Sequence, residues 1–325
     1  MKKLTGINAS QGEVCYSLFG GVVLVYLGID VGGSSIKYAL LRDNAFVFKK
    51  KVPTPPRDYQ LFLATLREIV AECGPSSLRG VGVCVPGKVD DQTGLVEYGG
   101  ALPYLHRKNL VEEIQRFADV PVFVDNDAKA AVRGEAFSGN LQGVEQGAVI
   151  VLGTGVGSGY ILDGKLRRGL NHQSGEVSSA IQDRDNAGKE SFVAGQCSAV
   201  GLIRDLADIL GVEPNGALVF SLLDTNAEAV EHLRLYGRRV GLLIYNLQTV
   251  LDLQRYVIAG GISTQPQVIE AINEGHDAIR ATDPPITETL QRPEIMAAKY
   301  RSDANLVGVV SCFLPERTPI TINCK

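Results

Sequence analysis

The chain has 325 residues, a hydrophobic content of 45%, a charged content of 21% and a formal net charge of −4 at pH 7. These values are typical of a folded globular protein with enough apolar residues for about two domains. The slightly negative charge and the absence of a long basic run argue against nucleic acid as a partner. Six scattered cysteines without a Cys-x-x-Cys pair argue against a zinc cluster and favour a cytoplasmic location.

The first glycine turn follows an apolar run. Residues 1–21 show no clear periodicity, and we expect them to form a disordered N-terminal extension. The apolar run over 22–29 is shorter than the roughly 20 residues of a membrane span, so we expect no membrane association. It is predicted to be a strand that ends at Asp30 and enters the turn Gly32–Ser34. Such a turn suits either a phosphate-binding hairpin or an ordinary hairpin.

Alternating strands and helices follow. In the first half, strands are predicted at 35–42, 45–51, 80–85 and 122–124, and helices at 58–73, 109–114 and 127–137. In the second half, strands are predicted at 147–152, 255–259 and 294–298, and helices near 190–210, 226–250, from about 266 and from about 302. The alternation indicates an α/β protein.

A second glycine turn, Gly153-Thr154-Gly155, follows the strand at 147–152. A dinucleotide-binding fingerprint would need a helix to open at these glycines, whereas the residues that follow favour a strand. Asp163-Gly164 then marks another tight turn. Two units of strand, glycine turn and strand therefore predict two related lobes that each offer a phosphate-binding hairpin.

Two carboxylates are candidates for chemistry. Asp127 lies where a strand ends and a helix begins, a position that suits either a catalytic carboxylate or a helix cap. Glu176 lies in an irregular segment after the second glycine turn, where a solvated charge is the simpler alternative.

Six motifs, in order and at suitable spacing, resemble the ROK family of sugar kinases and related repressors. The stretch Asp30-Val-Gly-Gly-Ser-Ser-Ile-Lys37 matches that family's D-x-G-G-T-x-x-K, with Ser34 in place of the usual threonine. The other matching segments are Gly80–Gly87, Val124–Ala128, Leu152–Gly157, Ile258–Ser263 and Asp303–Gly308. The resemblance extends from about Leu27 to Val309 and implies a two-lobed actin-like ATPase (ribonuclease H-like) fold with an active-site cleft between the lobes. It implies an N-terminal lobe over 22–125 plus about 300–325, and a C-terminal lobe over 126–299.

The resemblance implies an ATP- and Mg²⁺-dependent kinase acting on a small-molecule sugar, in the glucose, N-acetylmannosamine or β-glucoside class. Asp127 would be the catalytic base, and Asp30 would contact Mg²⁺ indirectly. The residues implied to bind sugar are Pro86, Gly87, Asn126, Glu176 and Glu190. The residues implied to bind ATP and its phosphates are Asp30, Gly32, Gly33, Ser34, Lys37, Gly153, Thr154, Gly155, Gly260 and Gly261.

The sequence departs from the family pattern after Glu176. Zinc-bearing members have G-E-x-G-H followed by a cysteine cluster, whereas Ser179 stands at the histidine position here and no cluster follows. We therefore expect no structural zinc, as in a branch that includes β-glucoside kinase-like proteins. Two alternatives to a kinase stay open. One is a sugar-responsive regulator of the same family, and the other, given the altered Ser178-Ser179, is a catalytically inactive sugar-binding relative. The oligomeric state is open, with a homodimer as one expectation.

Overall fold

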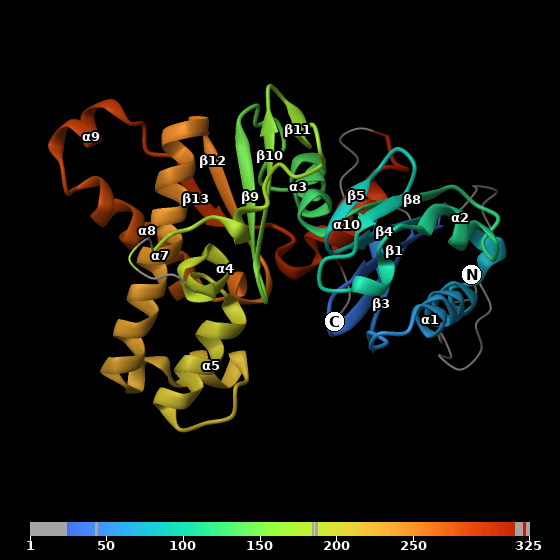
Figure 1. Cartoon of the computed structure of the whole chain (residues 1–325), viewed down its shortest axis with the longest axis horizontal. Coiled ribbons are helices and arrows are strands. Elements are labelled where there is room, and N and C mark those ends of the chain that lie inside the picture. The colour runs from blue at the N-terminus through green and yellow to red at the C-terminus, as the bar shows by residue number, and fades with distance from the viewer. Residues whose placement is uncertain (1–24, 43–44, 184, 186–187, 316–320, 323–325) are drawn as a thin grey trace, which may run out of the picture. The chain divides into compact units, whose positions relative to one another are not determined.

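The computed structural model describes residues 25–42, 45–183, 185, 188–315 and 321–322. The chain divides into two compact units, of which unit 2 is Asp127–Ser311 and unit 1 takes the rest. Each unit contains its own sheet and helices, which confirms the α/β prediction (Figure 1). The expected extension over 1–21 lies outside the described residues. No helix in the described part of the chain is long and apolar enough to cross a membrane.

Unit 1 is built on a six-stranded sheet with the order β14-β3-β2-β1-β4-β8. Its strands are β1 (Val25–Val31), β2 (Ser35–Arg42), β3 (Ala45–Pro53), β4 (Leu78–Val85), β8 (Val122–Asn126) and β14 (Thr321–Ile322). Every residue of β1 is buried, because this strand pairs with β2 on one side and with β4 on the other. The first glycine turn joins β1 to the antiparallel β2, as the sequence predicts.

Among the described residues, two α-helices and a second, smaller sheet complete unit 1. Helix α1 (Tyr59–Glu72) begins where the Asp58 side chain accepts a hydrogen bond from the Leu61 amide, and α2 (Leu110–Gln115) is capped by Asn109 in the same way. The small sheet contains β5 (Lys88–Asp90), β6 (Leu95–Tyr98) and β7 (Lys108–Asn109). Our sequence analysis missed these strands, because they are too short to show a periodic pattern.

Unit 2 contains a five-stranded sheet with the order β11-β10-β9-β12-β13. Its strands are β9 (Gly147–Leu152), β10 (Val156–Leu162), β11 (Lys165–Arg167), β12 (Arg255–Ala259) and β13 (Glu294–Ala297). The predicted hairpin at the second glycine turn is present, since β9 pairs antiparallel with β10. The turn at Asp163-Gly164 joins β10 to β11, with both residues at positive φ.

The α-helices of unit 2 are α3 (Asp127–Ser138), α4 (Val193–Gln196), α5 (Ala199–Leu210), α6 (Gly216–Leu222), α7 (Ala227–Leu251), α8 (Pro266–Arg280), α9 (Pro284–Thr289) and α10 (Ala304–Ser311). Helices α7 and α8 approach closely at Gly237 and Gly241, where an added Cβ would overlap or crowd the backbone of α8. The Gly-x-x-x-Gly spacing on α7 therefore serves helix packing.

Helix α10 packs against α3 within unit 2, where a Cβ on Gly308 would overlap the carbonyl oxygen of Ala130. We expected the segment from about residue 300 to belong to the N-terminal lobe. The division of the chain instead groups residues 300–311 with unit 2 and returns the chain to unit 1 at Cys312. The close backbone approach that Gly308 permits explains this placement.

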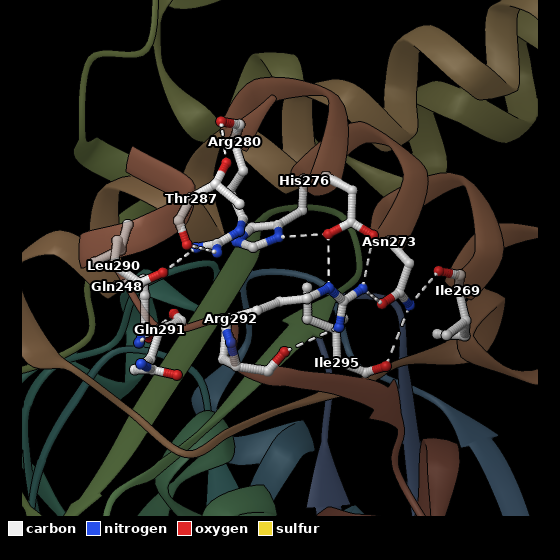
Figure 2. A network of polar contacts seen from close by, with 12 residues as sticks. Gln248, Ile269, Asn273, His276, Arg280, Thr287, Leu290, Gln291, Arg292 and Ile295 are labelled. Atoms are coloured by element: carbon white, nitrogen blue, oxygen red, sulfur yellow. Dashed lines mark hydrogen bonds and ion pairs between the residues drawn. The ribbon is translucent and has the colours of Figure 1, made fainter. Parts of the chain in front are cut away.

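A network of hydrogen bonds and ion pairs connects the end of α8 to the segment that precedes β13 (Figure 2). Arg292 donates through Nε and Nη2 to the two carboxylate oxygens of Asp277, at 2.7 and 2.9 Å, and also through Nη2 to Asn273. Arg280 donates to the carbonyl oxygen of Leu290. His276 is buried beside Asp277, with 3.5 Å between Nδ1 and a carboxylate oxygen.

Candidate functional site

Three strand ends bring candidate residues of unit 1 to one edge of its sheet. Strands β1, β4 and β8 are parallel, and their register pairs Asp30 with Cys84 and Cys84 with Asp125. The carboxyl ends of parallel strands lie at the same edge of a sheet, which is where α/β proteins bind ligands. Asp30, the turn at Pro86 and the side chain of Asn126 therefore share this edge.

Asp30 is a largely buried carboxylate with defined neighbours. Its Oδ1 accepts a hydrogen bond from the Cys84 thiol at 3.3 Å, and its Oδ2 lies 3.6 Å from Nζ of Lys37. Lys37 reaches it because the two residues are paired across β1 and β2. A carboxylate oxygen is the type of ligand that Mg²⁺ prefers, so Asp30 fits the role that the resemblance implies.

The turn Gly32–Ser34 is held by residues of the following strands. The amide of Gly32 donates to the carbonyl oxygen of Ser35 at 2.9 Å. Thr54 donates through its amide to Ser34 O and through its hydroxyl to Gly32 O. Gly33 and Ser34 are exposed, which leaves this part of the turn open to a ligand.

Pro86 and Gly87 form a turn that Asn126 holds directly. The Asn126 side chain donates through Nδ2 to the carbonyl oxygen of Gly87 at 2.8 Å. Gly87 has φ +94°, and a Cβ there would overlap the carbonyl oxygen of Tyr98 and crowd Gly100. The structure thus brings together three of the predicted sugar-binding residues. Our sequence analysis missed the supporting Gly99-Gly100 turn, although the Gly-Gly pair was a signal for it.

Asp127 begins helix α3 in unit 2. Its side-chain Oδ1 accepts a hydrogen bond from the Ala128 amide at 2.8 Å, which satisfies one of the amides in the first turn of the helix. The side chain is partly exposed, whereas Asp125 and Asn126 before it are buried. Asp127 is therefore the most exposed of these three polar residues at the junction.

The second glycine turn and the turn after β12 lie together in unit 2. Strands β9 and β12 are parallel, and Ala259 pairs with Val151, so Gly153 and Gly260 follow neighbouring strands. Gly260 has φ +102°, and a Cβ there would overlap the carbonyl oxygen of Leu152. Gly261 has no atom near its Cβ position, and Thr154 is exposed. The predicted phosphate turn and the turn at Gly260-Gly261 therefore follow neighbouring strands of one sheet.

The start of helix α5 forms hydrogen bonds to the second glycine turn. The carbonyl oxygen of Gly153 accepts hydrogen bonds from the amides of Ala199 and Val200 at the start of this helix. Burial raises the pKa of the neighbouring Cys197 thiol to about 12, so this thiol stays protonated near neutral pH. Cys197 is therefore an apolar packing residue of this turn and not a nucleophile.

Glu176 lies in a loop that is fixed on β10 although its own side chain is exposed. The amide and hydroxyl of Ser158 both donate to the carbonyl oxygen of Gly175, at 3.2 and 3.0 Å. The hydroxyl of Ser178 accepts from the amide of Val156 and donates to its carbonyl oxygen, both at 2.9 Å. These bonds on both sides hold Glu176 in place. Sequence reasoning did not identify Ser158 or Ser178.

Glu190 belongs to a short 3₁₀ helix, Lys189–Ser191. An isolated antiparallel bridge between Ile181 and Phe192 joins its segment to the chain that follows the Glu176 loop. The Glu190 side chain is exposed. The structure therefore connects the two predicted sugar-binding glutamates through the backbone of unit 2.

The described residues contain no group of three or more His, Cys, Asp and Glu side chains that could hold a metal ion. Ser179, which stands where zinc-bearing family members have histidine, is exposed. His172 is half-buried in the same irregular segment, at φ +55°.

Comparisons with known proteins agree with the motifs. The β-glucoside kinase of Listeria monocytogenes is 29% identical over 297 residues, which cover 88% of this chain and 96% of that protein. The N-acetyl-D-glucosamine kinase of Haemophilus influenzae is 26% identical over 309 residues, covering 89% and 99%. The fold matches that of a ROK family glucokinase from Streptomyces griseus, which was solved with glucose and AMPPNP, with a TM-score of 0.75. The two sequences are 24% identical, and the match covers 89% of this chain and 98% of that one. A sequence model of the ROK family matches residues 26–315. The chain therefore has the actin-like ATPase fold and belongs to the ROK family.

Proposed function

We propose that this protein is an ATP-dependent kinase that transfers the γ-phosphate of ATP to a hydroxyl group of a hexose or hexose derivative. Its relatives named above phosphorylate β-glucosides and N-acetyl-D-glucosamine, as their names state. The observation that carries the proposal is the junction of β8 and α3. There Asn126 is fastened to Gly87 and the next residue, Asp127, presents a partly exposed carboxylate.

Asp127 is the proposed catalytic base. A sugar hydroxyl becomes a better nucleophile when its proton passes to a carboxylate as the oxygen attacks phosphorus. The new bond joins the sugar oxygen to the γ-phosphorus, the bond to the bridging oxygen of ADP breaks, and the proton remains on Asp127. Phosphoryl transfer of this kind depends mainly on positioning and on neutralisation of phosphate charge.

The sugar would be held by hydroxyl-binding groups around this base. Carboxylates and amides accept and donate hydrogen bonds to sugar hydroxyls. We propose this role for Asn126, Glu176 and Glu190, with the turn at Pro86 and Gly87 shaping the pocket. Which sugar fits best is open, because Ser179 removes the histidine contact usual in the family.

The glycine turns would bind ATP. The turns Gly32–Ser34 and Gly153–Gly155, in which Gly33, Ser34 and Thr154 are exposed, suit phosphate oxygens. The turn at Gly260-Gly261, which is exposed at Gly261, suits adenosine. Mg²⁺ supplies charge neutralisation of the polyphosphate when it is bound, and Asp30 is the residue that would hold it or its water ligands. Lys37 is placed beside Asp30 to add a positive charge.

A direct test measures ADP release from ATP and Mg²⁺ across a panel of hexoses, N-acetylhexosamines and β-glucosides. We expect at least one sugar to give saturable release above the sugar-free rate. Product analysis by mass spectrometry should show a sugar monophosphate. A protein that binds a sugar of the panel without releasing ADP would instead be a sugar-binding relative or a regulator. We further expect this enzyme to act in the cytoplasm, with a homodimer as one assembly to test by light scattering.

A further inference from the structure

A lysine is buried in helix α3 two residues after the proposed base. The Lys129 side chain is only 2% exposed. Its Nζ donates to the carbonyl oxygen of Ser158 at 3.1 Å and to the carbonyl oxygen of Ser174. Burying an ammonium group is costly unless hydrogen bonds replace its water, so a buried lysine at this position needs a structural or functional reason.

The carbonyl groups of Ser158 and Ser174 that accept from Lys129 both belong to residues that support the Glu176 loop. Ser158 is the β10 residue whose amide and hydroxyl hold the carbonyl oxygen of Gly175, and Ser174 precedes that glycine in the loop. Gly175 has φ +92°, and a Cβ there would overlap Ser158 O and lie 3.1 Å from Lys129 Nζ. The loop therefore lies directly on the ammonium group and on β10, with no room for a side chain between them.

Helix α3 fixes the position of Lys129 relative to Asp127, because both residues lie in its first turn. Lys129 lies in the first turn of the helix that Asp127 begins, and α3 packs on β10 so closely that a Cβ on Gly157 would lie 3.0 Å from Cβ of Ala128. One side chain thus spans the distance between the helix of the base and the loop of Glu176. All of these residues belong to unit 2.

We propose that Lys129 is a positioning residue that holds the Glu176 loop at a fixed place relative to Asp127. In this role it sets where a sugar hydroxyl lies with respect to the base that takes its proton. The inference rests on the proposed function. Charge-assisted hydrogen bonds are stronger than neutral ones, which suits a group that must keep an irregular loop in one conformation.

The test compares Lys129→Met with Lys129→Arg and with a matched control. Methionine keeps an unbranched apolar side chain but removes the ammonium group, whereas arginine keeps a cation. Lys299→Met is the control, because Lys299 also donates to a backbone carbonyl of α3, that of Ser138 at 2.6 Å, at the far end of the helix. The melting temperature, the KM for sugar, the KM for ATP and kcat are measured for each protein.

For Lys129→Met we expect kcat/KM for sugar to fall by about 10- to 100-fold, as misplacement of reacting groups by about 1 Å does in enzymes. The KM for ATP should stay within about twofold of the wild type, since the glycine turns are supported by other contacts. Lys129→Arg should recover part of the loss, and Lys299→Met should leave all kinetic constants near those of the wild type.

If Lys129→Met is too unstable to purify, Lys129→Gln takes its place with the same expected pattern. Wild-type constants in a folded, uncharged Lys129 variant would overturn the proposal. The proposal would also be overturned if the KM for sugar and the KM for ATP changed equally and in proportion to the drop in melting temperature. That result would indicate that Lys129 has a purely structural role. A wild-type protein without kinase activity on any sugar would overturn the proposed function itself, and it is recognised before any variant is made.

Discussion

The ring of Phe313 lies stacked on the ring of Tyr26, with centroids 5.5 Å apart and an interplanar angle of 4°. Tyr26 is in the central strand β1, and a Cβ on Gly80 of neighbouring β4 would lie 2.9 Å from the Phe313 ring. Phe313 therefore covers this part of the sheet, because Gly80 leaves room for the ring.

Phe313→Ala should therefore destabilise unit 1. The ring is half-buried, so we expect a loss of about 1–3 kcal/mol, less than the 3–5 kcal/mol typical of a fully buried phenylalanine. The measurement is the denaturant midpoint of the purified protein. Cys312→Ala, which changes an exposed neighbour in the same segment, should leave the midpoint nearly unchanged, and equal effects of the two substitutions would contradict this account.

Asp127→Asn should lower kcat by about 10²- to 10⁴-fold, because an amide cannot take the proton of the sugar hydroxyl. Binding of ATP, measured by calorimetry, should persist. The exposed Asp224 in unit 2 provides a matched control, and Asp224→Asn should behave as the wild type. Near-normal turnover of purified Asp127→Asn would exclude Asp127 as the base.

Activity should require Mg²⁺ and no zinc. Removal of divalent ions with a chelator is expected to abolish ADP release, and added Mg²⁺ should restore it, since the polyphosphate charge must be neutralised during transfer. Asp30→Asn should raise the Mg²⁺ concentration needed for half-maximal rate several-fold. Elemental analysis of the purified protein checks the zinc expectation, and about one zinc per chain would contradict it.

Acidification should weaken unit 2 through His276. Burial lowers the pKa of this histidine below its ordinary value of about 6.5, so the unfolded chain binds the proton more tightly than the folded one. Stability from this group is then present above that ordinary value and is lost as the pH falls below it. The Arg292 guanidinium lowers the pKa of Asp277. The contribution of Asp277 to the free energy of unfolding is therefore lost only in stronger acid, below about pH 4.

The measurement is the free energy of unfolding at pH 7.5 and pH 5.5 for the wild type and for His276→Gln. The wild type should lose more stability between these two pH values than the variant does. Parallel losses in the two proteins would show that His276 does not titrate on unfolding in this range.

The regular parts of the fold and most candidate residues could be predicted from the sequence. Both glycine-turn hairpins and the helix that begins at Asp127 follow from local patterns of strand, turn and helix residues. The motif at Asp125-Asn126-Asp127 placed a carboxylate at a strand-to-helix junction, where the structure has it.

The remaining features depend on contacts between distant residues. Lys129 gave no signal, because a lysine in the first turn of a helix is usually exposed, whereas here it contacts β10 and the loop at Ser174. The same is true of Ser178, whose bonds to Val156 join segments 22 residues apart. The position of α10 depends on Gly308, because a residue with a Cβ would overlap the backbone of α3 there. This requirement cannot be read from the sequence of α10 alone.

Unit 1 is assembled from two stretches of chain, one that ends at Asn126 and one that begins at Cys312. During synthesis the whole of unit 2 leaves the ribosome before Phe313 does. Domains tend to fold as soon as their residues have emerged, so unit 2 can complete its core while Tyr26 and Gly80 still lack their partner ring. The first-made part of the protein is therefore the last to reach its native state, and a chain that stops before residue 313 would leave unit 1 without this ring.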